Sequence, residues 1–154
     1  MTHRRRLSRH ALSLTLLAAL AGCLSNPPKP SNVKLTLTAA ADVNPDANGR
    51  PSPVVVRIYQ LKVDAAFAGA EFFALYDDEQ KALGADLIKR DEFTLGPGES
   101  SPAPISVSPE ARFIGVVVAY RDYRNAAWRL VTKAPLRNNT TVSVGRAKVE
   151  LVTR

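Results

Sequence analysis

Short strand patterns, repeated along the chain, constrain its fold more than any other feature of the sequence. Val33, Leu35 and Leu37 alternate with polar residues, the period of two that is typical of a strand with one buried face. Further apolar or β-branched runs follow at residues 54–61, 90–95, 105–107, 112–120, 128–132 and 141–152, the last with a turn or bulge at Gly145. Roughly seven or eight short strands separated by turn residues predict an all-β chain, folded as an antiparallel β-sandwich.

Two of these runs indicate their position within a sheet. Residues 112–120 are nearly all apolar or β-branched, which is typical of a central strand covered on both faces. Residues 105–107 lie between prolines, and a proline cannot donate a hydrogen bond to a neighbouring strand. We therefore expect an edge strand at 105–107.

One segment departs from the strand pattern and predicts a small helical insertion. Asp64 is placed to cap a helix over residues 64–76, and Phe72, Leu75 and Tyr76 would share one face of it. A weaker turn of helix follows at 79–83. The segment carries an aromatic cluster that either packs the helix onto the sheet or forms a platform for a ligand: Phe67, Phe72, Phe73 and Tyr76.

The first 22 residues have the layout of a bacterial export signal. A basic start is followed by an apolar run at 11–20, which is too short to span a bilayer, and then by small residues. The run ends in Leu20-Ala21-Gly22-Cys23, the pattern of a bacterial lipobox, and Cys23 is the only cysteine of the chain. We expect residues 1–22 to be a signal peptide cleaved before Cys23. The alternative is an ordinary signal that happens to end in a cysteine.

Lipidation of Cys23 would fix the mature chain to a membrane. Such a cysteine carries a diacylglyceryl group and usually an N-acyl chain, and several acyl chains make attachment effectively permanent. Leu24 follows where aspartate would favour the inner membrane, so we expect the outer membrane, with the domain on its periplasmic face. Residues 23–32 contain three prolines and predict a semi-rigid tether. Residues 33–154 would then form the sandwich domain, and no cofactor is expected beyond the lipid.

Charge and histidine content exclude several classes of function. The whole chain has a formal net charge of +7, but four of its 21 Lys and Arg residues lie in the leader, whereas all 14 acidic residues follow Cys23. No basic stripe suited to a nucleic acid remains on the domain. Both histidines, His3 and His10, also lie in the leader, which removes Ser-His-Asp and Cys-His catalysis and the usual zinc ligands. The sequence predicts a binding protein rather than an enzyme.

A polar, turn-rich run separates the first two predicted strands. Residues 42–48 place an oxygen-bearing side chain at every second position, as a calcium-binding loop does. The spacing does not fit, because counted from Asp42 the required glycine falls on Ala47, and counted from Asn44 the twelfth position is Val55 instead of glutamate. We expect no metal here. The Asn-Pro and Asn-Gly pairs instead predict turns.

The stretch YRDYRNAAWR at residues 120–129 allows two interpretations. Arg121 and Asp122 follow the most apolar strand, and Trp128 and Arg129 begin the next one. In the first interpretation Arg121 pairs with Asp122 or another acidic residue and fixes the connection. In the second, the stretch is an exposed Arg and Trp patch that binds a partner.

Several motifs together resemble the TssJ family, also called SciN or VasD, the outer-membrane lipoproteins of the bacterial type VI secretion system. They are the lipobox at 20–23, then NPDANGRPSPVVVRIYQLK, FFALY, LGPGE and IGVVVAYRD with a Trp-Arg pair shortly after, in order through the mature domain. The resemblance implies a transthyretin-like β-sandwich with extra helical elements and no enzymatic activity. It also implies binding to the periplasmic C-terminal domain of the inner-membrane protein TssM, in a complex that includes TssL and spans the envelope.

In this family the loop between the first two strands engages TssM, and here that loop matches residues 40–53. The resemblance implies that its polar residues project from a rigid pair of strands and contact the partner: Asp42, Asn44, Asp46, Asn48, Gly49 and Arg50. Our leading hypothesis is an outer-membrane tether for the secretion complex. The alternative is a periplasmic lipoprotein that carries a small apolar ligand in its sandwich, beneath the aromatic helix.

Overall fold

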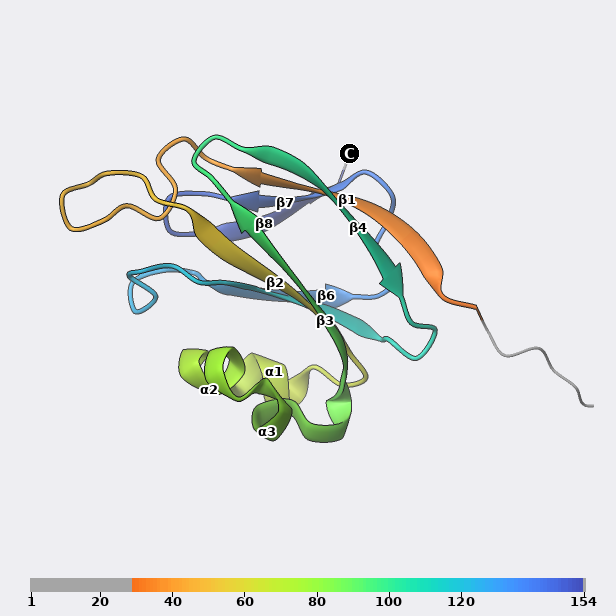
Figure 1. Ribbon diagram of the computed structural model, residues 1–154. Coiled ribbons are helices and arrows are strands. Elements are labelled where there is room, and N and C mark those ends of the chain that lie inside the picture. Colours follow the sequence, from red (N-terminus) through yellow and green to blue (C-terminus); the bar gives the residue numbers. More distant parts are fainter. Residues whose placement is uncertain (1–28, 154) are drawn as a thin grey trace, which may run out of the picture.

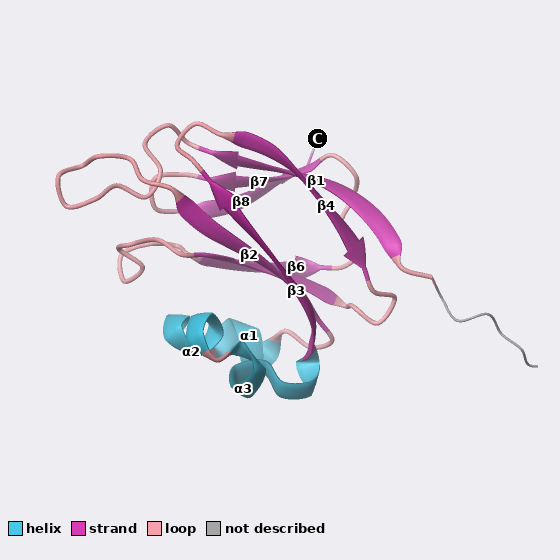
Figure 2. Cartoon of the chain, in the orientation of Figure 1, coloured by secondary structure: helices cyan, strands magenta, loops and turns pink. Residues whose placement is uncertain are grey.

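The computed structural model describes residues 29–153 as two β-sheets packed face to face, with short helices on one side (Figure 1, Figure 2). The predicted signal peptide at 1–22, the predicted lipidation site Cys23 and most of the predicted tether lie outside the described residues. The first strand begins at Ser31, slightly before the domain start expected at Val33. None of the helices within the described range is long and apolar enough to span a membrane.

The first sheet has the strand order β4-β1-β7-β8. Its strands are β1 (Ser31–Ala39), β4 (Ser100–Val107), β7 (Thr140–Val144) and β8 (Val149–Thr153). β4 is an edge strand, as its prolines predict. β1 pairs antiparallel with β4 but parallel with β7. This parallel pair departs from the expected antiparallel arrangement, because no hairpin joins β1 to β7 and nothing local fixes their relative direction.

The second sheet has the strand order β3-β2-β5-β6, and all its pairs are antiparallel. Its strands are β2 (Val54–Leu61), β3 (Leu87–Leu95), β5 (Phe113–Val118) and β6 (Arg129–Lys133). The predicted all-β sandwich with a small helical insertion is confirmed.

The main core lies between the two sheets, and in β1, β4 and β7 buried residues alternate with less buried ones. Leu35 and Leu37 of β1 pack there against the inner face of the second sheet. β5 is covered on both faces, as its sequence predicts: Val116 belongs to the core between the sheets, whereas Val117 packs into a second apolar cluster beneath the helices. β2 is divided in the same way, with Ile58 inward and Tyr59 under the helices. Burial on both faces explains why neither strand alternates with polar residues.

The helical insertion lies across the outer face of the second sheet (Figure 1). It contains α1 (Ala65–Gly69), α2 (Phe72–Asp77), α3 (Glu79–Leu83) and a 3-10 helix (Gly84–Asp86). The prediction of one helix over 64–76 is wrong, because the backbone is extended at Ala70 and Glu71, with ψ angles of 147° and 156°. Asp64 occupies the N-cap position of α1 but makes no side-chain capping hydrogen bond.

Two arginines of the second sheet hold the ends of these helices. Arg129 in β6 donates from Nη1 to the carbonyl oxygens of Phe67, at 3.1 Å, and Ala70. Arg57 in β2 donates from Nη1 to the carbonyl of Tyr76 at 2.7 Å. The last carbonyls of a helix lack partners within it and carry the negative end of its dipole, so a cation there stabilises the helix end. These contacts fix α1 and α2 to the sheet.

The aromatic cluster packs the insertion onto the sheet, the first of its two interpretations. The ring of Phe72 lies between Tyr123, at 4.8 Å between centroids, and Tyr76, at 5.4 Å, with the edge of Trp128 at 5.1 Å. Arg129 lies over the Trp128 ring at 4.8 Å. The Trp-Arg pair therefore serves this packing and is not an exposed patch.

Candidate functional site

One end of the sandwich gathers four connections between strands. They are the β1–β2 loop at 40–53, the β3–β4 turn at 96–99, the β5–β6 connection at 119–128 and the β7–β8 turn at 145–148. The chain enters β1 at the opposite end, on the right of Figure 1, and the 40–53 loop extends farthest to the left. The predicted site therefore lies at the end of the domain that faces away from its N-terminal entry.

The 40–53 loop has a buried base and an exposed tip. The side chain of Val43 is fully buried and belongs to the core between the sheets. The N–H of Val43 donates to the Ala40 carbonyl at 3.1 Å, and the N–H of Ser52 donates to the Val43 carbonyl at 3.1 Å, which closes the base. Residues 47–51 are exposed. The loop is thus anchored in the core and presents only its tip to solvent.

Asn44 is part of this base and does not project from it, contrary to the expectation from sequence. It is 4% exposed, and its side-chain amide donates to the Pro53 carbonyl at 2.8 Å. Its side-chain oxygen accepts the backbone N–H of Arg121 at 2.8 Å, and its own N–H donates to the Arg146 carbonyl at 3.2 Å. Its backbone has a φ of +48°, a conformation that asparagine tolerates better than most residues. Asn44 therefore ties three connections together, because its side-chain oxygen and one N–H of its amide are already engaged within the protein.

Asp46 and Arg50 close the tip into a compact ring. One carboxylate oxygen of Asp46 accepts the backbone N–H groups of Asn48, at 2.8 Å, and Arg50, at 3.0 Å. The other oxygen accepts Nε of Arg50 at 2.8 Å and lies 2.8 Å from its Nη2. Gly49 supplies the positive φ, +79°, that this turn requires.

The same contacts shift the titration of Asp46. The backbone N–H of Arg50, then its guanidinium and the N–H of Asn48, lower the pKa of the Asp46 carboxyl below its ordinary 3.8. Each of these donors binds the charged carboxylate more strongly than the neutral acid. The ring is therefore closed while Asp46 is ionised.

The structure brings four of the six predicted contact residues together and separates the other two. Asp46, Asn48, Gly49 and Arg50 form the tip, with the Arg50 side chain 77% exposed. Asp42 lies at the base, where its exposed carboxylate is 3.8 Å from Nη1 of Arg146. Asn44 is buried beside it. The role of these residues in binding stays a prediction.

Sequence analysis missed the neighbours of the loop. A cleft of about 140 Å³ opens beside its base, lined by Asn44, Pro45, Tyr120, Asp122, Arg146 and Ala147. The hydroxyl of Tyr120 donates to the Gly145 carbonyl at 3.1 Å, and burial raises the pKa of that hydroxyl. These residues lie far apart in sequence, so no local pattern could have placed them around one cleft.

The other interpretation of 120–129 expected Arg121 to pair with Asp122 or another acidic residue, and among residues 29–153 Arg121 forms no such ion pair. Asp122 instead accepts two hydrogen bonds from the side-chain amide of Asn125, at 2.9 and 3.0 Å. Arg121 contributes its backbone N–H to Asn44 and leaves its side chain exposed. The connection is fixed by these bonds instead.

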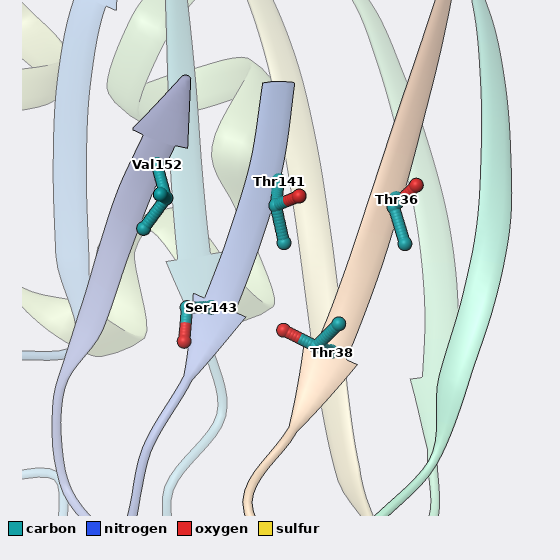
Figure 3. Close-up of a pocket in the computed structure, with 5 residues that line it drawn as sticks. All are labelled: Thr36, Thr38, Thr141, Ser143 and Val152. Carbon is teal, nitrogen blue, oxygen red and sulfur yellow. The ribbon is translucent and has the colours of Figure 1, made fainter. Parts of the chain in front are cut away.

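Three further observations concern possible sites for a small ligand or a metal. A shallow hollow of about 360 Å³ lies on the uncovered face of the first sheet, where the hydroxyls of Thr36, Thr38, Thr141 and Ser143 gather next to Val152 (Figure 3). A ligand carrier would need space beneath the aromatic helix, but there Phe67 and Phe72 are packed against the sheet. Within residues 29–153 no group of three or more His, Cys, Asp or Glu side chains is arranged to hold a metal.

Comparison with known proteins gives consistent matches. A profile of the type VI secretion lipoproteins (VasD, EvfM, TssJ) matches residues 31–148. The crystal structure of the lipoprotein TssJ1 from Pseudomonas aeruginosa is 38% identical, with a TM-score of 0.73, over 81% of this chain and 97% of that one. The Serratia marcescens protein Lip, a membrane-bound component of the type VI secretion system, is 28% identical, with a TM-score of 0.75, over 81% and 98%.

A third similar chain comes from the structure described as the TssM C-terminal domain of the type VI secretion system from EAEC. It is 28% identical, with a TM-score of 0.68, and the match covers 80% of this chain and 98% of that one. No curated protein sequence matches the chain. The family profile and the solved structures therefore carry the comparison.

Proposed function

This chain belongs to the type VI secretion lipoprotein family, and from that premise we propose that it tethers the secretion complex to the outer membrane. Lipid chains on Cys23 hold it on the periplasmic face of that membrane. Its domain binds the periplasmic C-terminal domain of TssM, within a complex that also contains TssL. The protein acts by binding and not by catalysis.

The observation that carries this proposal is the position of the 40–53 loop relative to the entry of the chain. β1 contains nine residues, which separate Ser31 from Ala39 by about 26 Å at the rise of an extended strand. The lipid-bearing residue precedes β1, whereas the loop follows it. A domain hung from its N-terminus by a stiff proline-containing segment thus turns the loop away from the membrane, toward an inner-membrane partner.

The conformation of the loop also supports a role in binding. Val43 and Asn44 hold its base, and the Asp46–Arg50 ring holds its tip. A loop that is ordered before it meets a partner loses little conformational freedom on binding, so more of the contact energy remains as affinity. The similar chain in a structure described by the TssM C-terminal domain supports the identity of the partner.

The test is binding of the full chain to the periplasmic domain of TssM from the same organism. The chain is produced with its leader and extracted in mild detergent. The test variant keeps Val43, Asn44 and Ser52 and replaces residues 46–50 by an equally long Gly/Ser segment, so that the base stays intact. The control variant replaces Pro109 and Glu110 by Gly-Ser in the β4–β5 connection, at the opposite end of the sandwich.

We expect the wild type and the control to bind and the tip variant to lose binding while its circular dichroism spectrum is unchanged. Equal binding by all three would move the contact away from the tip. A folded wild type that does not bind would refute the tether itself.

The anchor has its own test. Cys23→Ser removes the acceptor of the lipid, so we expect the domain to leave the outer-membrane fraction and become soluble in the periplasm. Recovery of the variant from the outer membrane, in amounts like the wild type, would contradict lipid attachment as the means of anchoring.

A further inference from the structure

The β5–β6 connection lies beside the 40–53 loop and is rigidly joined to it. Its Arg121 N–H is held by Asn44. Ala127 donates to the Ala147 carbonyl in the β7–β8 turn at 2.9 Å and accepts the N–H of Val149 in β8 at 3.1 Å. Arg146 in that turn accepts the N–H of Asn44. The three connections therefore form one surface with a fixed arrangement, instead of three independent loops.

The carboxylates of this end are mostly satisfied by groups close to them. Asp46 is bound by Arg50, Asp122 by the amide of Asn125, and Glu99 in the β3–β4 turn by the N–H of Gly96 at 2.6 Å. Asp42 lies 3.8 Å from Arg146. Each of these carboxylates thus has a positively charged or N–H partner within this end of the domain.

Arg121 and Arg124 differ from these residues. Both are exposed, and within residues 29–153 neither forms an ion pair, although the charge of Arg121 contributes to lowering the pKa of the Asp46 carboxyl. Nε of Arg124 donates to the Tyr123 hydroxyl at 3.2 Å, and its guanidinium lies 5.7 Å from the centre of that ring. Tyr123 is itself packed on Phe72, which limits the freedom of the arginine beside it. The connection thus presents two cations on a rigid support.

We propose that Arg121 and Arg124 form a second part of the partner-binding surface and attract an acidic segment of the same partner that the 40–53 loop contacts. This proposal rests on the tether proposed above. Exposed charges at the rim of an interface act mainly on the rate of encounter, because their field guides an oppositely charged partner into register. The cleft between Asn44, Tyr120 and Arg146 lies next to this pair and accepts a small side chain of the bound segment.

The position of the pair argues for a protein partner over lipid phosphates. The connection that carries Arg121 and Arg124 lies at the end of the sandwich opposite the entry of the chain (Figure 1). It therefore lies away from the membrane to which the N-terminus would be anchored. Anionic vesicles are nevertheless included in the test, because arginine also binds phosphate well.

The test measures the association rate between the full chain in detergent and the periplasmic domain of TssM from the same organism, at low and high salt. The test variant is Arg121→Glu with Arg124→Glu. The control is Lys133→Glu, at the far end of β6, with Arg137→Glu, in the β6–β7 connection that follows, and it changes the net charge by the same amount. Asn44 binds the backbone N–H of Arg121, so the substitutions leave this hydrogen bond to the loop intact.

We expect the test variant to associate about tenfold more slowly at low salt, with the difference shrinking at high salt, and the control to behave as the wild type. The tip variant of residues 46–50 is measured alongside. Loss of binding in the tip variant, together with normal rates in the Arg121/Arg124 variant, would overturn this proposal and leave the tether standing. A folded wild type that does not bind overturns both.

Co-sedimentation of the Cys23→Ser chain, which lacks the acceptor of the lipid, with phosphatidylglycerol vesicles gives the remaining readout. Vesicle binding that requires Arg121 and Arg124, with an unchanged rate toward the protein partner, would assign the pair to a lipid surface and overturn the proposal. Absence of such binding together with slowed association supports it.

Discussion

The ring of Phe67 in α1 lies directly on Gly115 in β5: a Cβ atom on Gly115 would be 2.5 Å from Cζ of the ring. Carbon atoms that are not bonded do not approach so closely. The absence of a side chain at Gly115 therefore lets the helical insertion reach the sheet, and Phe67 is fully buried as a result.

We predict that Gly115→Ala destabilises the domain by about 1–3 kcal/mol, because the new methyl group overpacks a rigid ring. Phe67→Leu in the same chain should restore part of the loss, since the two sites are coupled. Urea unfolding measures both. Gly69→Ala is the control, as a Cβ there meets no atom within 4 Å. Equal stability of Gly115→Ala and the wild type would show that the insertion shifts freely over the sheet.

We predict that Asn44→Ala loosens the loop base and destabilises the domain by about 1–3 kcal/mol, since the Pro53 carbonyl and the Arg121 N–H lose their partner. Asn44→Gly should cost less, because glycine adopts the positive φ without strain. Hydrogen exchange at the Arg121 amide should accelerate in both variants. Asn48→Ala, in the exposed tip, serves as the control. Unchanged exchange at Arg121 would show that Asn44 does not hold the β5–β6 connection.

We predict that the Asp46 carboxyl titrates below pH 3.8 in the folded protein, because N–H groups and the guanidinium of Arg50 bind its charged form. A folded pKa below the unfolded value means that the stabilising contribution is present above pH 3.8 and is lost as the pH falls through the folded pKa. An NMR titration of the carboxyl gives the midpoint. Arg50→Gln should raise it toward 3.8, and a midpoint unchanged by that substitution would argue against the ring.

We predict that the domain loses stability as the pH rises above 10, in part through Tyr59. Burial raises the pKa of Tyr59 to about 12, from an ordinary value of 10.0. Between these values the unfolded chain releases a proton that the folded one retains, so the free energy of unfolding falls with pH. Tyr59→Phe should flatten this fall but not abolish it, since burial also raises the pKa of Tyr120.

The cost of Tyr59→Phe at neutral pH follows from its contacts. The hydroxyl lies 3.1 Å from the Leu75 carbonyl and 3.0 Å from Oε2 of Glu79, so it joins β2 to α2 and α3. We expect a loss of about 0.5–1.5 kcal/mol in urea unfolding. If the free energy of unfolding of Tyr59→Phe fell as steeply between pH 10 and 12 as that of the wild type, the alkaline effect would not come from Tyr59.

The strands could be predicted from sequence because their signal is local. Val33, Leu35 and Leu37 alternate with polar neighbours, and all three are buried as that alternation requires. The broken helix could not be predicted in this way, because apolar spacing continues across Ala70. The contact that accompanies the break comes from Arg129, which is 59 positions away.

The 40–53 loop could likewise be predicted only in part. Its turns at Asn44 and Gly49 follow from residue types that tolerate a positive φ. The Asn44 side chain accepts the N–H of Arg121, which lies 77 positions later. No property of residues 40–53 alone predicts this contact. The polarity of Asn44 suggested a contact residue, whereas the fold uses that polarity to hold the loop in place.

The interior position of β1 also bears on how a tether withstands tension. In the proposed tether, a pull between a lipid anchor at Cys23 and a partner held at the 40–53 loop would run along the axis of β1. That strand is bonded to β4 on one side and β7 on the other, so the load acts on both ladders in shear. Many hydrogen bonds must then yield together, whereas a strand pulled sideways would lose them one after another. Forced unfolding is governed by the unfolding rate and not by equilibrium stability, so this geometry gives mechanical strength to a domain of ordinary size.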